Sequence, residues 1–317
     1  MSKNSGDTRP RTRSAPGAAR PSTAPPSGRA SIPWLLVGGV VAAVIIVGGT
    51  AFVAGSRNPA GGGGPTAAGD EFGHIHGLSI DPASRTVYAA THHGLFRVAG
   101  EHSVVRVSTQ APDLMGFAVV GPGHFLASGH PGTGDGGPAD LGLVESTDGG
   151  VTWRTLSLPG AADFHGLRAA HGAVYGYSAR DATFMVSTDR RTWQRRATVP
   201  MGAFAVSPTE ADTILAVGRD GLMRSTDGGR TWLQVGDAPQ FTVLTWDQSP
   251  EIWGGDLAGI VWRSTDGGTK WSRRGALPAP PEALATHGGT VYAAVDGARI
   301  LASTDGGATW QVTYSPG

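Results

Sequence analysis

Histidines gather in one short stretch of the sequence, residues 73–96, which reads GHIHGLSIDPASRTVYAATHHGLF. Four of the chain's ten histidines lie here, as the pair His74 and His76 and as the adjacent His92 and His93. A neutral imidazole ligates transition metals, and it also acts as a general acid, a general base or a hydrogen-bonding group for an organic ligand. The stretch therefore predicts a metal site, an acid–base or organic-ligand site, or solvated loop residues without a joint role.

The elements that must position these side chains are indicated by a repeat. The box STDGGVTW at 146–153 recurs as STDGGRTW at 225–232, STDGGTKW at 264–271 and STDGGATW at 303–310, with a shortened copy, STDRRTW, at 187–193. Successive boxes begin 38 to 41 residues apart. A period near 40 residues with strand-like sequence between the copies is typical of propeller blades. We therefore predict an all-β fold, a six-bladed β-propeller over 70–317, in which the first blade lacks a box.

The box itself has a mechanical explanation. An Asp side chain accepts hydrogen bonds from nearby backbone N–H groups and closes a tight turn, and the glycine pair permits positive φ. The Trp that follows buries a large ring between neighbouring sheets. We expect a structural role for Asp148, Trp153, Asp189, Trp193, Asp227, Trp232, Asp266, Trp271, Asp305 and Trp310. The shortened copy has Arg190 and Arg191 in place of the glycines, so its turn must close differently.

The S-x-D-G-G-x-x-W boxes resemble those of Asp-box (BNR) propellers, a group that includes sialidases, sortilin-type receptors and photosystem II assembly propellers. The run from His74 through DLMGFAVVGPGHFLASGHP (113–131) to the first box is more closely similar to a bacterial, mainly actinobacterial, family of membrane-anchored Asp-box proteins. Members of that family are identified as glycosyl hydrolases. The resemblance covers about residues 70–317 and implies the fold, whereas the implied hydrolase activity follows only from the fold, which hosts unrelated functions.

Blade topology predicts where the histidines lie. The connection that enters the first strand of a blade and the connection between its second and third strands share one face, here called the top face. Six histidines from three consecutive blades, together with one methionine, map to this face: His74, His76, Met115, His92, His93, His130 and His165. Imidazoles suit zinc or copper, and a neighbouring thioether favours copper. These residues are candidate metal ligands, and a role in binding an organic molecule stays open.

Carboxylates on the same face bear on the hydrolase activity. The sialidase resemblance requires three arginines, an early Arg-Ile-Pro motif and a Tyr–Glu pair, yet residues 74–82 read HIHGLSIDP and no Arg-Ile-Pro occurs. Sialidase chemistry is therefore not expected. A generic glycosidase needs two carboxylates beside the sugar. Asp113 and Asp163, close to the histidines in the predicted blades, are the candidate catalytic pair.

The N-terminal part of the chain is of a different kind. Residues 1–31 are rich in Pro, Ser, Ala and Arg and are expected to form a disordered cytoplasmic tail. Residues 32–54 carry no charge and are long enough for one transmembrane helix, with the basic residues before it favouring a cytoplasmic N-terminus. A cleaved signal peptide is the alternative. Residues 55–69 form a Gly-rich linker, so we predict a plasma-membrane protein with an extracytoplasmic propeller.

Composition excludes several classes. The chain has no cysteine, which excludes disulfides and thiolate chemistry, and its formal net charge is zero without a clustered basic face, so no nucleic-acid partner is expected. The predicted function is a binding module, expected to be monomeric, whose top face over blades 1 to 3 holds copper or zinc, a glycan or an envelope protein. A glycoside hydrolase and a scaffold for the assembly of envelope proteins are the alternatives.

Overall fold

The computed structural model describes residues 72–247 and 250–316. The predicted tail (1–31), transmembrane helix (32–54) and linker (55–69) lie outside the described residues. Within the described ranges, no helix combines the length and apolar character needed to cross a membrane.

Six four-stranded antiparallel sheets make up the described part of the chain, and each contains four consecutive strands. Blade 1 comprises β1 Ile75–Ile80, β2 Val87–Thr91, β3 Gly94–Gly100 and β4 Ser103–Arg106, and blade 2 comprises β5 Asp113–Gly121, β6 His124–His130, β7 Leu143–Ser146 and β8 Arg154–Ser157. Blade 3 comprises β9 Phe164–Ala170, β10 Ala173–Ser178, β11 Thr183–Ser187 and β12 Gln194–Thr198, and blade 4 comprises β13 Met201–Val206, β14 Ile214–Gly218, β15 Gly221–Ser225 and β16 Leu233–Gln234. Blade 5 comprises β17 Phe241–Thr245, β18 Ile252–Asp256, β19 Ile260–Ser264 and β20 Ser272–Ala276, and blade 6 comprises β21 Pro281–His287, β22 Thr290–Val295, β23 Arg299–Ser303 and β24 Gln311–Tyr314.

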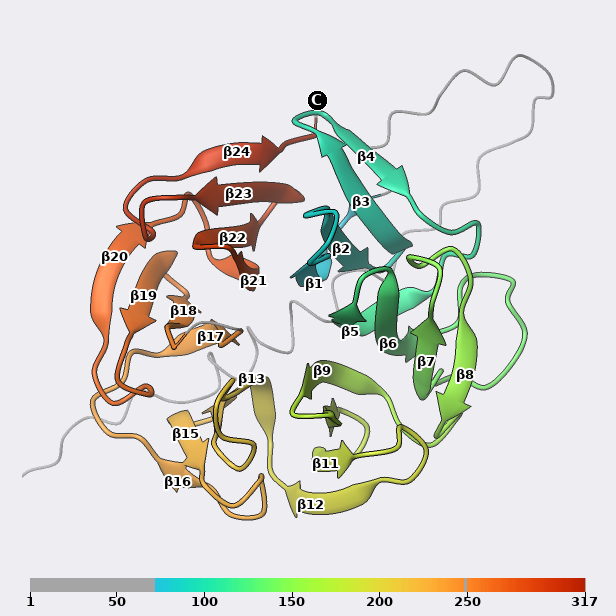
Figure 1. Ribbon diagram of the computed structural model, residues 1–317, viewed down its shortest axis with the longest axis horizontal. Helices are drawn as coiled ribbons and strands as arrows, with labels where there is room; N and C mark the ends of the chain where they lie inside the picture. The colour runs from blue at the N-terminus through green and yellow to red at the C-terminus, as the bar shows by residue number, and fades with distance from the viewer. Residues whose placement is uncertain (1–71, 248–249, 317) are drawn as a thin grey trace, which may run out of the picture. The chain divides into compact units, whose positions relative to one another are not determined.

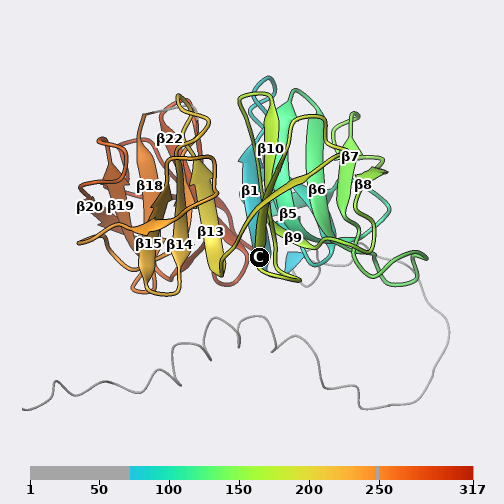
Figure 2. The ribbon, with the colours of Figure 1, turned by 90° about the horizontal axis from the view of Figure 1, so that it is seen from below.

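The sheets are arranged as blades around a central axis, with β1, β5, β9, β13, β17 and β21 innermost (Figure 1). Viewed from the side, the strands cross the thickness of this ring (Figure 2). The prediction of an all-β, six-bladed propeller is therefore confirmed. Blade 1 forms without a box, as expected, with a turn of different sequence between β3 and β4.

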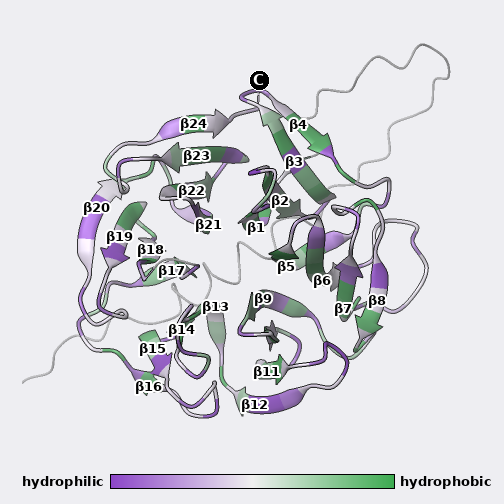
Figure 3. Ribbon diagram, viewed as in Figure 1, coloured by the Kyte–Doolittle hydropathy of each residue, from purple (hydrophilic) through white to green (hydrophobic). Residues whose placement is uncertain are grey.

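Burial explains why these segments form strands. Second strands such as β2 and β10 are buried at every position, because neighbouring blades cover both faces of each sheet. Outer strands such as β8, β12 and β20 are mostly exposed or half-buried and carry polar residues on the rim (Figure 3). The hydrophobic clusters therefore lie between blades, as one between blades 2 and 3 built on Leu126, Phe164 and Leu167 illustrates.

The repeated boxes form the turns between the third and fourth strands of their blades. In the second full-length box, Asp227 Oδ1 accepts hydrogen bonds from the Arg230 and Thr231 N–H groups (3.0 and 2.9 Å), and Oδ2 accepts one from the Thr231 hydroxyl (2.6 Å). These bonds hold the pKa of Asp227 below its ordinary value. Gly228 and Gly229 follow with φ of 72° and 88°, a conformation that L side chains rarely adopt.

The shortened box keeps the aspartate hydrogen bonds, with Asp189 Oδ1 accepting from the Arg191 and Thr192 N–H groups (2.8 and 2.7 Å), and adds an arginine contact to the neighbouring blade. Arg190 takes the left-handed conformation (φ 62°) and its guanidinium donates to Glu145 Oε1 in blade 2 (2.8 Å). Glu145 is 4% exposed and also contacts Arg154 and His124. Burial alone would raise the pKa of Glu145, but these three contacts outweigh it and the pKa lies below its ordinary value. A cluster of cationic side chains around the buried Glu145 thus ties blades 2 and 3 together where the glycine pair is missing.

The ring closes between the last and the first blade by side-chain packing and backbone hydrogen bonds. Tyr314 at the end of β24 packs edge-on against Phe72, which packs edge-on against Phe96 of β3, with ring centroids 5.0 and 5.1 Å apart. The Ser315 N–H donates to the Glu101 carbonyl (2.7 Å). No strand is exchanged between the ends of the described chain, since every sheet is made of consecutive strands.

Candidate functional site

A β-bulge occurs at the top end of every innermost strand. In each blade the strand pairing skips one residue there, so that two consecutive residues of the partner strand face positions two apart. The six skipped residues are His76, Met115, His165, Gly202, Thr242 and Glu282. All six line one cavity of about 150 Å³, here called the mouth cavity. Bulges re-aim side chains, and here they aim one residue per blade at the mouth of the central channel.

In blades 2 and 3, close packing of the inner strands requires a glycine after the bulge. A Cβ at Gly116 would overlap the Phe164 carbonyl oxygen of the next blade, and one at Gly166 would lie 2.8 Å from the Phe204 ring. The bulge and the glycine therefore work together: the glycine lets the blades approach, and the bulge turns the preceding side chain into the mouth cavity.

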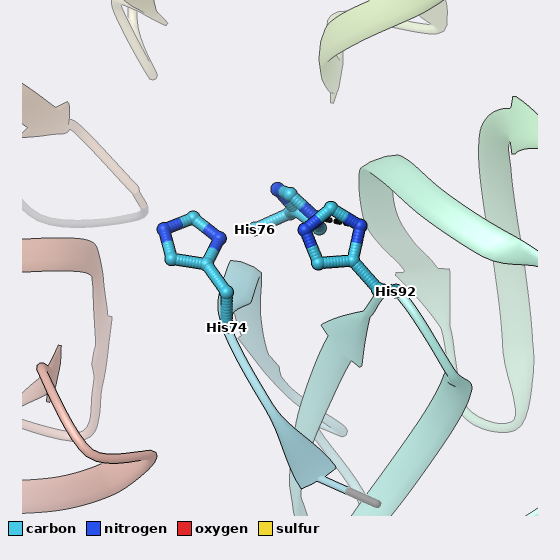
Figure 4. A group of neighbouring side chains, drawn as sticks. All are labelled: His74, His76 and His92. Atoms are coloured by element: carbon cyan, nitrogen blue, oxygen red, sulfur yellow. Dashed lines mark hydrogen bonds between the residues drawn. The ribbon is translucent and has the colours of Figure 1, made fainter. Parts of the chain in front are cut away.

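Three histidines of blade 1 form the first cluster, which consists of His74, His76 and His92. His74 lies just before β1, His76 is the bulged residue of β1, and His92 lies in the turn between β2 and β3. Their imidazoles point toward one another (Figure 4), with ring centroids 4.2 Å apart for His76 and His92 and 4.8 Å apart for His74 and His76. One ligand atom from each ring can be chosen so that all three lie within 4.8 Å of one another.

Asp113 of β5 completes this cluster from blade 2. His76 Nε2 lies 3.2 Å from His92 Nδ1, which lies 3.0 Å from Asp113 Oδ1, and the third side of the triangle, from His76 Nε2 to Asp113 Oδ1, is 3.6 Å. Two ligands bound tetrahedrally at about 2.0–2.1 Å from one Zn²⁺ are roughly 3.3 Å apart. The three donor atoms therefore already have the spacing of ligands around a single ion.

Hydrogen bonding alone does not satisfy this triangle. A proton on His92 Nδ1 can be directed at His76 Nε2 or at Asp113 Oδ1, and without that proton the ring nitrogen faces the carboxylate lone pairs directly. A cation between the three atoms interacts favourably with all of them. In addition, His74 Nδ1 is buried and makes no hydrogen bond to a described residue, so another donor of the first cluster lacks a partner.

Burial favours the neutral form of two histidines of this cluster, His76 and His74. Burial, followed by the neighbouring His92, His74, His165 and His130, lowers the pKa of His76 to about 2. Burial and His92 also lower the pKa of His74. Glu282 lies 3.6 Å from His74 Nε2 and accepts a hydrogen bond from the Ile75 N–H, and burial raises its pKa. His76 is thus a neutral imidazole at neutral pH, the form that binds metals.

The second cluster consists of His130, Asp163 and His165. His130 ends β6, Asp163 precedes β9, and His165 is the bulged residue of β9. His165 Nε2 lies 2.8 Å and His130 Nε2 lies 3.8 Å from Asp163 Oδ2. The six top-face histidines therefore do not form one group: two clusters adjoin the mouth cavity, one mainly in blade 1 and one between blades 2 and 3.

Two of the candidate ligands stand apart from both clusters. The exposed His93 lies beside Gly73, and its backbone N–H donates to Thr91 Oγ1 (3.0 Å). Met115 is the bulged residue of blade 2 and lines the mouth cavity together with His76 and His165.

The candidate catalytic carboxylates do not lie together as a separate pair. Asp113 contacts His76 and His92, and Asp163 contacts His165 and His130. The sequence places Glu282 among the carboxylates that could reach the top face but not among the candidate site residues, although it neighbours His74. Its position in blade 6 matches that of His76 in blade 1, and this match could have identified it.

Histidines at the opposite end of the channel remain separate. His171 and His287 line a larger cavity of about 800 Å³ formed by the turns between first and second strands. His171 Nε2 hydrogen-bonds the Ser207 carbonyl (2.7 Å). No group of three potential metal ligands includes either residue among those that the structure describes.

No family model matches the chain, and no curated protein matches it. Among solved structures, the chain is similar to one in the nidogen/laminin complex, with 12% identity over 73% of this chain and 93% of the other and a TM-score of 0.58. It is also similar to a catalytically inactive virginiamycin B lyase from Staphylococcus aureus solved with quinupristin, with 12% identity over 77% and 85% of the two chains and a TM-score of 0.51. YCF48 bound to D1 peptide gives 17% identity over 75% and 80% of the chains and a TM-score of 0.49. At such identities the likeness shows the β-propeller fold alone.

Proposed function

We propose that this protein is a binding module that holds a first-row transition metal ion, Zn²⁺ or copper, on the top face of its propeller. The first cluster and Asp113 supply the ligands. The observation that carries the proposal is the triangle of His76 Nε2, His92 Nδ1 and Asp113 Oδ1, with sides of 3.2, 3.0 and 3.6 Å. Three imidazoles and one carboxylate form a four-ligand set of the kind that zinc and copper accept.

His74 is the proposed fourth ligand. Its buried Nδ1 has no hydrogen-bond partner among the described residues, and its ring faces the other two (Figure 4). Glu282 accepts the Ile75 N–H and lies within 3.6 Å of His74 Nε2, so it orients the His74 ring from the far side. A carboxylate that orients a ligating imidazole also strengthens it as a ligand.

We further propose that the propeller works outside the plasma membrane, anchored by residues 32–54. The uncharged 23-residue segment and the basic residues before it support this orientation. Protease added to intact cells that express the full chain would digest the propeller, and protection of the propeller until lysis would contradict the proposed topology.

Calorimetric titration with Zn²⁺ and Cu²⁺ tests the metal site, using full-length chain purified without a polyhistidine tag. We expect His92→Ala to weaken binding at this cluster by more than about 100-fold, because even a residue that only orients a ligand is worth roughly 10–100-fold. The control is His287→Ala, a partly buried histidine at the opposite end of the channel. Equal affinities in wild type and His92→Ala would refute the proposal.

A further inference from the structure

We infer that His130, Asp163 and His165 form a second metal site, separate from the first cluster, whose open coordination position faces the mouth cavity and takes a small carboxylate ligand. This goes beyond the proposed function, because the second site has its own ligand set on blades 2 and 3 and stands whether or not the first cluster binds metal.

The spacing of the donor atoms suits one ion. His165 Nε2 and His130 Nε2 lie 2.8 and 3.8 Å from Asp163 Oδ2, and the three ligand atoms all lie within 4.8 Å of one another. The two distances to Asp163 Oδ2, 2.8 and 3.8 Å, lie on either side of the roughly 3.3 Å expected between two ligands of a tetrahedral zinc ion. Small rotations of the two rings would bring all three donors to a common centre.

The His130 ring is oriented for this role. Its Nδ1 lies 3.0 Å from the Ala139 carbonyl oxygen. A carbonyl oxygen only accepts hydrogen bonds, so Nδ1 carries the proton and the lone pair is on Nε2, the atom that faces Asp163. Metal-ligating histidines are characteristically held in this way, with the second ring nitrogen donating to a carbonyl or carboxylate oxygen.

Asp163 is held in place with one oxygen unused. The residue is 8% exposed, and its Oδ1 is buried without a hydrogen-bond partner among the described residues. Its backbone is fixed, since its carbonyl accepts the Ala179 N–H (2.9 Å) and the following residue, Phe164, donates its N–H to Ser128 Oγ (3.0 Å). A buried carboxylate oxygen without a partner is costly, and a bound cation removes that cost.

Two imidazoles and one carboxylate leave the ion coordinatively unsaturated. Sites with three protein ligands keep a position for water or for a substrate group. Of the three ligands, His165 borders the mouth cavity, and we assign the open position to that side. Space of about 150 Å³ accommodates only a small ligand.

A cation at the base of the same cavity favours an anionic ligand. Arg168 lines the mouth cavity, and the hydrogen bond that its guanidinium makes to a described residue goes to the Leu167 carbonyl (2.8 Å), which leaves other N–H groups unused. Guanidinium groups pair with carboxylates through two parallel hydrogen bonds. A small carboxylate in this cavity would bind the metal through a carboxylate oxygen, and Arg168 would supply a positive charge in the lining of the same cavity.

Metal stoichiometry separates the two sites. Full-length chain without a polyhistidine tag is dialysed against Zn²⁺, and bound zinc is measured by elemental analysis. We expect about two zinc ions per wild-type chain, about one in the isosteric variant Asp163→Asn, and about one in His76→Ala combined with His92→Ala. A melting curve of each metal-free variant verifies that it is folded.

The outcomes are distinguishable. If Asp163→Asn binds as much zinc as wild type, the second site is refuted, whatever the first cluster does. If the double histidine variant binds as much as wild type while Asp163→Asn binds less, the first cluster fails and the second site stands. Cobalt bound to the double variant tests the open position, because acetate should change its visible spectrum, and an unchanged spectrum would overturn the assignment of a carboxylate ligand.

Discussion

Metal binding at the first cluster should be measurable as thermal stabilisation of the propeller. An ion that binds only the folded chain and is present at about 100 times its Kd raises the free energy of unfolding by about 2.7 kcal/mol. In domains of about 150–250 residues, the size class of this propeller, 1 kcal/mol shifts the Tm by about 2–4 °C. The first cluster alone is therefore expected to raise the Tm by about 5–11 °C in Zn²⁺.

The perturbation is His76→Ala combined with His92→Ala, which removes two corners of the donor triangle. Each protein is scanned by differential calorimetry with EDTA and then with Zn²⁺, so that its own metal-free Tm is the reference. We expect the zinc-dependent increase to fall by about 5–11 °C relative to wild type. This comparison is unaffected by any change that the substitutions cause in the metal-free protein.

His287→Ala is the matched control, because it removes a partly buried histidine of the same propeller from the opposite end of the channel. It should retain the full zinc-dependent increase. Equal increases in the double variant and in wild type would refute the reasoning, since the ion would then bind elsewhere.

Three further substitutions test the ion pairs of Glu145, the ring closure and the backbone that supports the first cluster. Glu145→Gln should lower the free energy of unfolding by about 2–3 kcal/mol at pH 7, less than the roughly 3–5 kcal/mol of a fully buried pair, because its cationic partners are partly exposed. Since the pKa of Glu145 is lowered in the folded protein, this contribution is lost at acid pH. Urea titrations of wild type and variant should therefore differ less at pH 3 than at pH 7, and a larger difference at pH 3 would contradict the assignment. Tyr314→Ala should cost about 3–5 kcal/mol by opening the ring closure, whereas Val312→Ala on the same strand, 46% exposed, should stay within about 0.5 kcal/mol by chemical denaturation. Gly129→Ala should weaken zinc binding roughly 10–100-fold in calorimetric titration, because its Cβ would overlap the backbone carbonyl of Asp113. Gly136→Ala is the control, since a Cβ there meets nothing within 4 Å, and it should leave the zinc affinity unchanged.

The periodic part of the fold could be predicted from the sequence because the repeat is local. Each box closes a turn through bonds within eight residues, so its spacing gives the blade repeat and locates the third and fourth strands of the five blades that carry a box. Ring closure could not be predicted in this way. Phe72 and Tyr314 meet across nearly the whole propeller sequence, and neither belongs to a repeated motif.

The sequence predicts which face of the propeller carries the candidate site, but it does not predict how the side chains are arranged on that face. Strand direction alone brings His74, His92 and His165 to one end of the channel. It does not determine that His92 points into the first cluster while its neighbour His93 lies beside Gly73. Nor does it separate the histidines into two clusters, which depends on ring orientation and on the carboxylate that each ring faces.

The bulges were also not predicted from the sequence, although a short residue pattern accompanies them. The bulged residue is followed by a small residue and then a large apolar one in five of six blades, as in His76-Gly77-Leu78. Because this pattern spans three residues and its first position varies freely, it is far weaker than the box. It becomes recognisable only when the six blades are aligned on their first strands.

The freedom at that first position explains how a repetitive fold builds an asymmetric site. Blades 2 and 3 need the small residue because the next blade packs against it, whereas the type of the residue that the bulge turns into the channel mouth differs from blade to blade. Chemistry can therefore be concentrated without disturbing the blades: blades 1 to 3 present His76, Met115 and His165, while blades 4 and 5 present Gly202 and Thr242. The boxes stabilise the opposite ends of the sheets, so the residues that maintain the fold and those proposed to bind metal lie apart on each blade.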